Sequence, residues 1–254
     1  MTNIILSGCG GRMGQAIVRA AEGSTTCRIV AGVDINADAI APVCAFPVYG
    51  AISDFPGKAD VIVDFSHHTA LPALADYATK TNTPIVLATT GYTDEEKELI
   101  ARSAEQVAVF SSGNMSIGIN LLIELCRTAA RTLGESFDVE IVEKHHNQKL
   151  DAPSGTALMI ADALREEREQ TEYVYDRHAV RAKRDSAQIG IHSIRGGTIV
   201  GEHEVLFAGK DEMITLTHTA TSREIFANGA LKAAHYLAGK GAGRYDMSDL
   251  INGR

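Results

Sequence analysis

The stretch that decides the fold runs from residue 4 to residue 14. It reads Ile4-Ile5-Leu6-Ser7, an apolar run, and continues as Gly8-Cys9-Gly10-Gly11-Arg12-Met13-Gly14. An apolar run that ends in glycines and passes into a helical pattern is typical of a strand, a tight turn and a helix. Glycines let the backbone approach a pyrophosphate, and the helix start offers free N–H groups to the anion. Residues 8–14 are therefore candidate cofactor-binding residues.

Asp34 strengthens the interpretation of this loop as a nucleotide site. The last glycine of the loop falls one residue late for a strict G-x-G-x-x-G, and a glycine loop alone could be a tight turn without a ligand. Asp34 ends the second apolar run, 20 residues after Gly14. A carboxylate at that distance accepts hydrogen bonds from the ribose of a dinucleotide, although a solvated strand end would look similar. Strand, glycine loop, helix, strand and acid together predict a nucleotide-binding domain.

Asp34 also bears on the choice of cofactor. Its carboxylate would repel the 2′-phosphate of NADPH, and the residues that follow it, Ile35 and Asn36, are neutral. We therefore expect NADH to be preferred. Arg12 remains available to a 2′-phosphate, so the use of NADPH stays open.

Two further loops follow apolar runs and contain small or hydroxyl side chains. One holds Ala88, Thr89, Thr90 and Gly91, and the other runs from Ser111 through Ser112, Gly113 and Asn114 to Met115. Open α/β sheets bind ligands at the carboxyl ends of their strands, so these loops are candidates to contact a ribose or nicotinamide. Ordinary turns would have much the same composition.

The first half of the chain alternates between short apolar runs and helical patterns. Such alternation predicts a Rossmann-like parallel sheet covered on both faces. The expected strands are residues 4–7, 28–33, 61–65, 84–88 and 107–110, and the expected helices are residues 13–21, 68–79 and 93–104. The last of these helices begins with the capping-box pair Thr93 and Glu96.

The second half changes character and predicts an α+β domain. A helix is expected from Ile117 to Ala129, a strand around Val139 to Glu143, and a second helix after Pro153-Ser154. Three strands separated by glycine-containing turns then suggest an antiparallel meander: residues 188–195, 198–207 and 213–220. A last helix is expected from Arg223 to Leu237, and it is a candidate to pack back on the first domain.

Composition excludes several classes of protein. The net charge is −8, and 22% of the residues are charged. Nucleic-acid binders usually carry a basic face, and the sequence shows no sign of one. No apolar run approaches the ~20 residues of a membrane span, and the chain enters a strand without a signal peptide, so the cytoplasm is the expected location. The four cysteines are scattered and are expected to be reduced thiols.

A cationic segment between strand and helix is the most informative part of the second half. It reads Glu143-Lys144-His145-His146-Asn147-Gln148-Lys149-Leu150-Asp151-Ala152-Pro153-Ser154-Gly155-Thr156-Ala157. His145, His146 and Lys149 supply nitrogen donors, and Ser154-Gly155-Thr156 opens a helix whose N–H groups suit an anion. Adjacent histidines on an extended chain point apart, so no metal is expected. A solvated polar loop is the alternative interpretation; of the other histidines, only His203 is kept as a candidate.

With these segments identified, the chain resembles the dihydrodipicolinate reductase family. The segment from residue 140 to residue 157 matches the family signature at every fixed position, namely Glu140, Glu143, His145, His146, Lys149, Asp151 and Pro153-Ser154-Gly155-Thr156-Ala157. Further matching stretches are residues 8–14, 89–91, 114–120, 199–203, 222–223 and 226–230. The resemblance spans nearly the whole chain.

The resemblance implies a complete assignment of fold, reaction and residue roles. It implies hydride transfer from NAD(P)H to the cyclic imine dicarboxylate 4-hydroxy-tetrahydrodipicolinate, giving tetrahydrodipicolinate, in the diaminopimelate route to lysine. His145 would donate or accept the proton with Lys149 as its partner, and His146, Ser154, Gly155 and Thr156 would hold the substrate. The cofactor would contact residues 8–14, Asp34, residues 88–90 and residues 112–115. Residues 1–115, completed by residues 228–254, would form the dinucleotide domain. Residues 116–227 would form a central α+β domain with an open mixed sheet, through which a homotetramer assembles.

Two departures from the family pattern and two rival functions bear on this assignment. The basic residue that NADPH-using members carry after the ribose acid is absent, and the loop at Ser111-Ser112-Gly113 is one residue longer than in some relatives. An aldehyde or semialdehyde dehydrogenase would need an activated cysteine, and none of the four lies in a suitable motif. A regulator that only senses NADH would leave the cationic segment unexplained.

Overall fold

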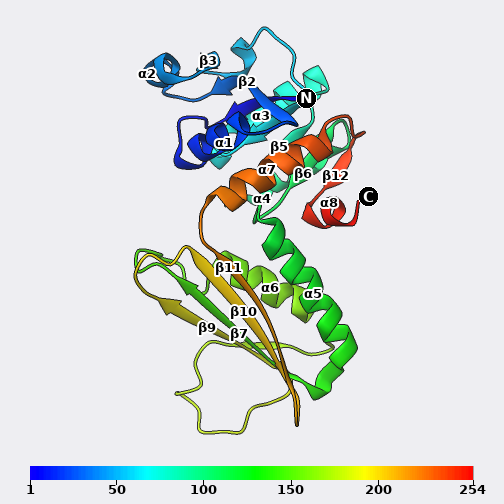
Figure 1. Ribbon diagram of the computed structural model, residues 1–254. Helices are drawn as coiled ribbons and strands as arrows, with labels where there is room; N and C mark the ends of the chain where they lie inside the picture. Colours follow the sequence, from blue (N-terminus) through cyan, green and yellow to red (C-terminus); the bar gives the residue numbers. More distant parts are fainter. Residues whose placement is uncertain (254) are drawn as a thin grey trace. The chain divides into compact units, whose positions relative to one another are not determined.

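The computed structural model describes residues 1–253, and the chain divides into two compact units (Figure 1). The first unit comprises residues 1–117 together with the C-terminal stretch from Arg223 onward. The second unit is the continuous segment Gly118–Ser222. The first unit is thus assembled from both ends of the chain.

The first unit contains a seven-stranded sheet in which all paired strands are parallel. The strand order is β12-β6-β5-β4-β1-β2-β3. The strands are β1 (Thr2–Ser7), β2 (Cys27–Val33), β3 (Val48–Tyr49), β4 (Val61–Asp64), β5 (Ile85–Leu87), β6 (Ala108–Ser111) and β12 (Gly243–Tyr245). The Rossmann-like sheet predicted from the sequence is confirmed; the short β3 and β12 were not foreseen.

Helices cover both faces of this sheet, as the nearly continuous apolar strands require. They are α1 (Arg12–Glu22), α2 (Ala37–Ile40), α3 (Leu71–Thr81), α4 (Asp94–Ala104), α7 (Glu224–Leu237) and α8 (Met247–Asn252). On one face, Ile4 and Leu6 of β1 pack into a core with residues of α1 and α7. Ile5, which points the other way, packs into a core with residues of α3 and α4. Side-chain alternation along one strand therefore supplies both cores.

The start of α4 shows how local sequence fixes an element. The Thr93 side chain accepts a hydrogen bond from the Glu96 N–H at 3.2 Å, and the Glu96 carboxylate accepts one from the Thr93 N–H at 2.8 Å. This is the predicted capping box, which satisfies two N–H groups that the helix itself leaves open.

The second unit contains a mixed five-stranded sheet in the order β11-β10-β7-β9-β8. Its strands are β7 (Asp138–His145), β8 (Glu172–Val174), β9 (Gln188–Arg195), β10 (Gly201–Ala208) and β11 (Met213–Ala220). Residues of α5 (Ile117–Leu133) and α6 (Gly155–Arg165) pack with one face of this sheet into a separate core (Figure 1).

The predicted antiparallel meander is only partly correct. β10 and β11 do form an antiparallel hairpin, but β9 pairs in parallel with β7, which lies between β9 and β10. The turn at Gly196-Gly197 passes over the end of β7 instead of joining neighbours: the Gly196 N–H donates to the His145 carbonyl at 2.9 Å. Strand pairing is a long-range property, so a short turn did not reveal the intervening strand.

Candidate active site

The glycine loop of the first unit lies between β1 and α1, as predicted. Gly8 has φ +76°, a conformation that favours glycine. A Cβ on Gly14 would lie 2.2 Å from the Gly8 carbonyl oxygen, so only glycine allows α1 to start so close to the loop. The Gly10 N–H donates to the Asp34 carboxylate at 2.9 Å, which ties the loop to the end of β2.

A cleft of about 1150 Å³ lies along this loop, within the first unit. Gly8, Gly10, Gly11 and Asp34 line it, and so does Ser66 after β4. Among the other predicted loop residues, Cys9 and Gly14 are buried, while Arg12 and Met13 begin α1. Burial, with a further contribution from Asp34, raises the pKa of the Cys9 thiol to about 11, so Cys9 fills space instead of reacting.

Asp64 joins the loops that follow β4 and β5. This buried carboxylate accepts hydrogen bonds from the Ser66 hydroxyl at 2.5 Å and the Thr89 hydroxyl at 2.9 Å. Sequence reasoning proposed Ala88, Thr89 and Thr90 here but missed Asp64. The available signal was a single acid closing the apolar run of β4.

The predicted segment Ser112–Met115 forms a turn at the end of β6. The Ser112 hydroxyl donates to the Asn114 carbonyl at 2.7 Å. A Cβ on Gly229 would lie only 1.7 Å from the Met115 carbonyl oxygen. Because Gly229 has no side chain, α7 can approach this turn closely. Within the described residues 1–253, neither this turn nor residues 88–90 lines the cleft of the first unit.

The second unit gathers charged side chains at the end of β7. Glu143 is fully buried, and its carboxylate accepts a hydrogen bond from His145 Nδ1 at 2.6 Å. Arg195 of β9 donates to both carboxylate oxygens, at 2.8 and 2.7 Å. The Ser154 N–H, at the start of α6, donates to the same carboxylate at 3.1 Å. We call Glu143, His145, Arg195 and Ser154 the Glu143 cluster.

Strand alternation explains why these side chains meet. Glu143 and His145 lie two residues apart on β7, so they share the face that carries Val139 and Ile141 into the core. Arg195 is the register partner of His145 across the parallel β7–β9 pair. Sequence reasoning missed Arg195, because nothing local shows that its strand lies beside β7.

The charges of the Glu143 cluster shift the pKa values of its members. Burial of Glu143 opposes its ionisation, but hydrogen bonds from Arg195, Ser193 and His145 outweigh burial and lower its pKa to about 2. Burial lowers the pKa of His145, Glu143 opposes that shift, and Lys149 and Arg195 reinforce it. The cluster therefore holds an ionised carboxylate beside an imidazole that favours its neutral form.

His203 of β10 completes the polar layer behind His145. It is buried, its ring lies edge-on to His145 with centroids 5.2 Å apart, and its Nε2 lies 3.2 Å from the Ser154 hydroxyl. Burial, reinforced by His145, lowers the pKa of His203 to about 4. The neighbouring Gly201 would bring a Cβ within 3.1 Å of His145 Nε2, so glycine leaves this nitrogen its space.

The remaining predicted residues surround this cluster. Lys149 forms an ion pair with Asp151 at 2.8 Å. The Ser154 hydroxyl accepts from the Ala157 N–H at 3.2 Å and caps α6, whose first residues are Gly155 and Thr156. His146 immediately follows β7, and its carbonyl accepts from the Lys149 N–H at 3.1 Å. The helix start predicted as an anion pocket therefore follows directly on the buried cluster.

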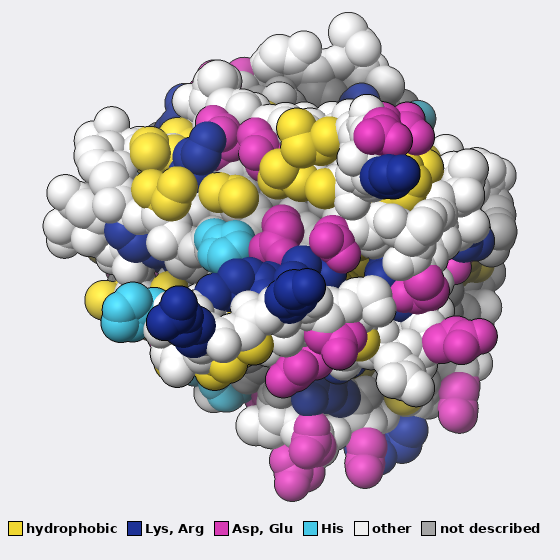
Figure 2. Space-filling view, turned by 90° about the horizontal axis from the view of Figure 1, so that it is seen from below, with side chains coloured by type: hydrophobic (Ala, Val, Ile, Leu, Met, Phe, Trp, Pro, Cys, Tyr) yellow, Lys and Arg dark blue, Asp and Glu magenta, His cyan; other side chains and the backbone are white. Residues whose placement is uncertain are grey.

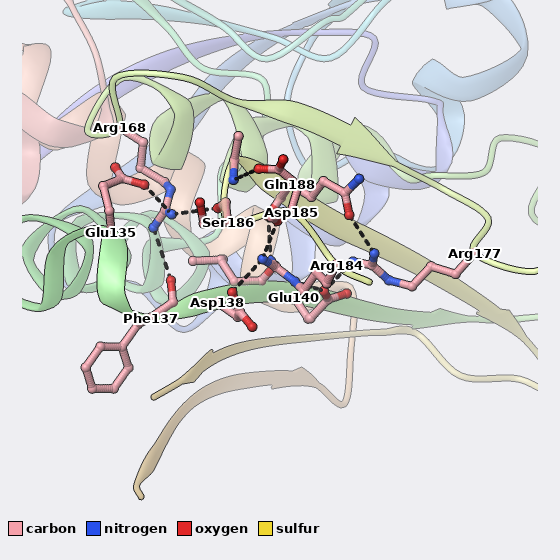
Figure 3. Close-up of polar contacts among 12 residues, drawn as sticks. Glu135, Phe137, Asp138, Glu140, Arg168, Arg177, Arg184, Asp185, Ser186 and Gln188 are labelled. Carbon is pink, nitrogen blue, oxygen red and sulfur yellow. Dashed lines mark hydrogen bonds and ion pairs between the residues drawn. The ribbon is translucent and has the colours of Figure 1, made fainter. Parts of the chain in front are cut away.

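A second cluster in which a glutamate accepts hydrogen bonds from histidine and arginine lies on the opposite face of β7. Glu140 accepts from His192 Nε2 at 2.8 Å, from Arg177 at 2.5 Å and from Arg184 at 3.0 Å. Figure 3 shows Arg184 reaching from its loop toward Glu140 and Asp138. We call Glu140, His192, Arg177 and Arg184 the Glu140 cluster. Burial opposes the ionisation of Glu140, but His192 and Arg184 outweigh it and lower its pKa.

Surface charge, metal-binding groups and helix hydropathy complete the description of the site. On the face that Figure 2 shows, Lys and Arg side chains lie beside Asp and Glu side chains, so the basic groups there do not form an unbroken positive patch. In residues 1–253 no group of three or more His, Cys, Asp or Glu side chains could hold a metal ion. None of the described helices combines the length and apolar character needed to cross a membrane.

Comparison with known proteins agrees with this geometry. The family description "Dihydrodipicolinate reductase, N-terminus" matches residues 2–115, and "Dihydrodipicolinate reductase, C-terminus" matches residues 118–251. A 4-hydroxy-tetrahydrodipicolinate reductase of Caldanaerobacter subterraneus subsp. tengcongensis is 49% identical, with 99% of this chain and 98% of that protein covered. One of Clostridium novyi is 47% identical, and both chains are covered completely.

Solved structures point the same way. A dipicolinate-bound dihydrodipicolinate reductase from Paenisporosarcina sp. TG-14 has a TM-score of 0.81 and 26% identity, and 97% of each chain is covered. A probable dehydrogenase from Thermotoga maritima, at 11% identity and a TM-score of 0.64, shares the fold, with 99% of this chain and 89% of that chain covered. The resemblance seen in the sequence is confirmed: the chain belongs to the dihydrodipicolinate reductase family and is an NAD(P)H-dependent oxidoreductase.

Proposed function

We propose that this reductase converts 4-hydroxy-tetrahydrodipicolinate to tetrahydrodipicolinate in the diaminopimelate route to lysine, and that it prefers NADH. The observation that carries the proposal is the Glu143 cluster: a buried carboxylate–imidazole pair placed directly before a helix start. A small dicarboxylate needs donors for its carboxylates and a group that manages a proton beside them. The names of the relatives support the same substrate.

The residues of the first unit fit a dinucleotide. Gly8, Gly10 and Gly11 line the cleft, and the N-terminus of α1, which has no side-chain cap at Gly11, follows them directly. Asp34 lines the same cleft and is positioned to accept hydrogen bonds from a ribose. These contacts support the roles proposed for residues 8–14 and Asp34, and residues 88–90 and 112–115 would bind further along the same sheet edge. When bound, the reduced nicotinamide supplies a hydride to the substrate.

The second unit would then manage charge and the proton. Ser154, Gly155 and Thr156 offer a capped helix start to one carboxylate, and His146 and Lys149 add donors. Because Nδ1 of His145 is bonded to Glu143, Nε2 is the nitrogen available to a substrate. A dianionic substrate favours the charged imidazolium, so binding would draw a proton onto His145. His145 or Lys149 would then deliver the proton that must follow hydride transfer.

The family resemblance also supports assembly and location. We propose that residues 116–227 bind substrate and mediate a homotetramer, and that residues 228–254 complete the dinucleotide domain of residues 1–115. We propose the cytoplasm as the site of action, because the substrate and the reduced cofactor are metabolites of that compartment.

A coupled assay tests the reaction and the cofactor preference. Pyruvate and aspartate semialdehyde, condensed by the preceding synthase, generate the substrate in place, and oxidation of NADH and NADPH is compared at equal concentrations. NADH is expected to react faster. Asp34→Asn should reduce that preference about tenfold, since a hydrogen bond to a charged group contributes about 1.5 kcal/mol or more.

Asp38→Asn provides a matched control, because Asp38 is an exposed acid on the neighbouring α2 and does not line the cleft. It should leave the NADH preference as in the wild type. Faster oxidation of NADPH by the wild type would overturn the role of Asp34. No oxidation of either nucleotide by folded protein would overturn the proposed reaction.

A further inference from the structure

Glu143 is a buried charge that has no step of its own in the proposed reaction. Its side chain has no exposed surface, yet it is ionised and contacts His145, Arg195 and the N–H of Ser154. An ionised carboxylate out of contact with water is costly unless every lone pair is matched. Here the matching groups belong to the proposed proton site and to the proposed anion pocket, so Glu143 connects the two.

The contact with His145 determines which ring nitrogen is free. Glu143 accepts only from an N–H, so the proton of the neutral ring resides on Nδ1 and the lone pair on Nε2. Gly201, directly opposite on β10, leaves space at Nε2 that any side chain would reduce. Ring orientation and tautomer are therefore both set from behind the ring.

Arg195 controls how strongly Glu143 acts on the ring. Alone, a carboxylate at 2.6 Å would favour the imidazolium form of His145. Arg195 donates to both oxygens of that carboxylate and offsets its charge. It also donates to the Asp151 carbonyl at 2.7 Å, which anchors the loop that carries Lys149.

We propose that Glu143 and Arg195 form a positioning pair for His145, an inference that rests on the proposed function. Glu143 fixes the orientation and tautomer of the ring, and Arg195 offsets the carboxylate so that the ring stays neutral until a dianionic substrate binds. Neither residue touches the substrate.

The charged groups around His145 each influence the pKa of its ring. Glu143 lies on its own strand, Arg195 on β9 and His203 on β10, while Lys149 approaches from the following loop with Asp151 as its partner. Of these groups, Glu143 favours the protonated ring, whereas Arg195 and Lys149 disfavour it, as does His203 when it is charged. Removing Glu143 or Arg195 must therefore move the titration of His145 in opposite directions.

The experiment compares Glu143→Gln, Arg195→Gln and Arg195→Lys in the full-length enzyme. The readouts are the pH profile of kcat/KM, the NMR titration of the His145 ring, and the affinity for dipicolinate. Glu143→Gln should move the titration to lower pH, and Arg195→Gln should move it to higher pH. Arg195→Lys, which keeps the charge, should return it toward the wild type. For Glu143→Gln, kcat should fall by about 10²-fold or more, since a misplaced tautomer in a comparable carboxylate–imidazole pair costs up to about 10⁴-fold.

Glu140→Gln is the matched control: the same substitution, on the same strand, at a second glutamate that accepts hydrogen bonds from histidine and arginine. It should leave the His145 titration unchanged. Shifts in the same direction for Glu143→Gln and Arg195→Gln, or an equal shift for Glu140→Gln, would overturn the proposal. If Glu143→Gln does not fold, the two Arg195 variants decide the matter. The NMR titration is independent of turnover, so a failure of the proposed reaction would be seen separately as an inactive wild type.

Discussion

The two glutamate clusters of β7 have nearly the same composition and opposite properties. Glu143 and Glu140 each accept hydrogen bonds from histidine and arginine, but the odd spacing between them places them on opposite faces of the sheet. The side chains of Glu143 and His145 are 0% and 11% exposed, whereas those of Glu140 and His192 are 23% and 40% exposed. Glu143 binds the Nδ1 of its histidine, and Glu140 binds the Nε2 of its own. The Glu143 cluster therefore differs from the Glu140 cluster in its burial and in which histidine nitrogen remains free. The types of residue hardly differ.

The largest expected effect separates the two histidines by activity. His145→Gln and Lys149→Met should each lower kcat by about 10²- to 10⁴-fold, the usual worth of a general acid or base. His192→Gln should leave kcat near the wild-type value, because its ring serves only the Glu140 cluster. NADH binding, followed by fluorescence titration, should survive in all three variants. An inactive His192→Gln enzyme that binds NADH would break the comparison.

The second effect separates the two glutamates by stability. Glu143→Ala should lower the free energy of unfolding by about 3–5 kcal/mol, because it removes the fully buried carboxylate that pairs with the half-buried Arg195. Glu140→Ala should cost about 1 kcal/mol, as for ion pairs that water still reaches. Urea denaturation followed by circular dichroism measures both values. Equal losses would show that the difference in burial has no energetic consequence.

The third effect is the pH dependence of stability that the buried His203 contributes. The folded-state pKa of His203 is about 4 and its ordinary value is 6.5, so between these values the unfolded chain binds the proton more readily. Stability is therefore lost as pH falls through that window, by at most about 3 kcal/mol at 1.36 kcal/mol per pKa unit. His203→Gln should flatten the dependence, whereas His178→Gln, on an exposed loop, should follow the wild type. Urea midpoints measured across the window check this, and a curve unchanged by His203→Gln would contradict it.

Local patterns predicted the parts of the molecule that local interactions determine. The glycine loop, the Thr93 capping box and the Ser154 cap of α6 all depend on residues a few positions apart, and all lie where the sequence indicated.

Long-range pairing produced the features that the sequence did not reveal. Arg195 reaches Glu143 only because β9 lies parallel to β7, and the glycine turn after it resembles a hairpin turn. Asp64 acquires Thr89 as a partner only when β4 and β5 lie side by side. The strands β3, β8 and β12, of two or three residues each, carry too few side chains for a recognisable period.

The division of the first unit between both ends of the chain has a consequence for synthesis on the ribosome. Ala230, Ala234 and Leu237 of α7 belong to the core that Ile4 and Leu6 begin. That core therefore stays open on one side until nearly the whole chain has emerged. Residues 118–222 are continuous, so their own core can close earlier. The part of the protein translated first is the part completed last, and during that interval its β-sheet exposes an apolar face on which a chaperone can act.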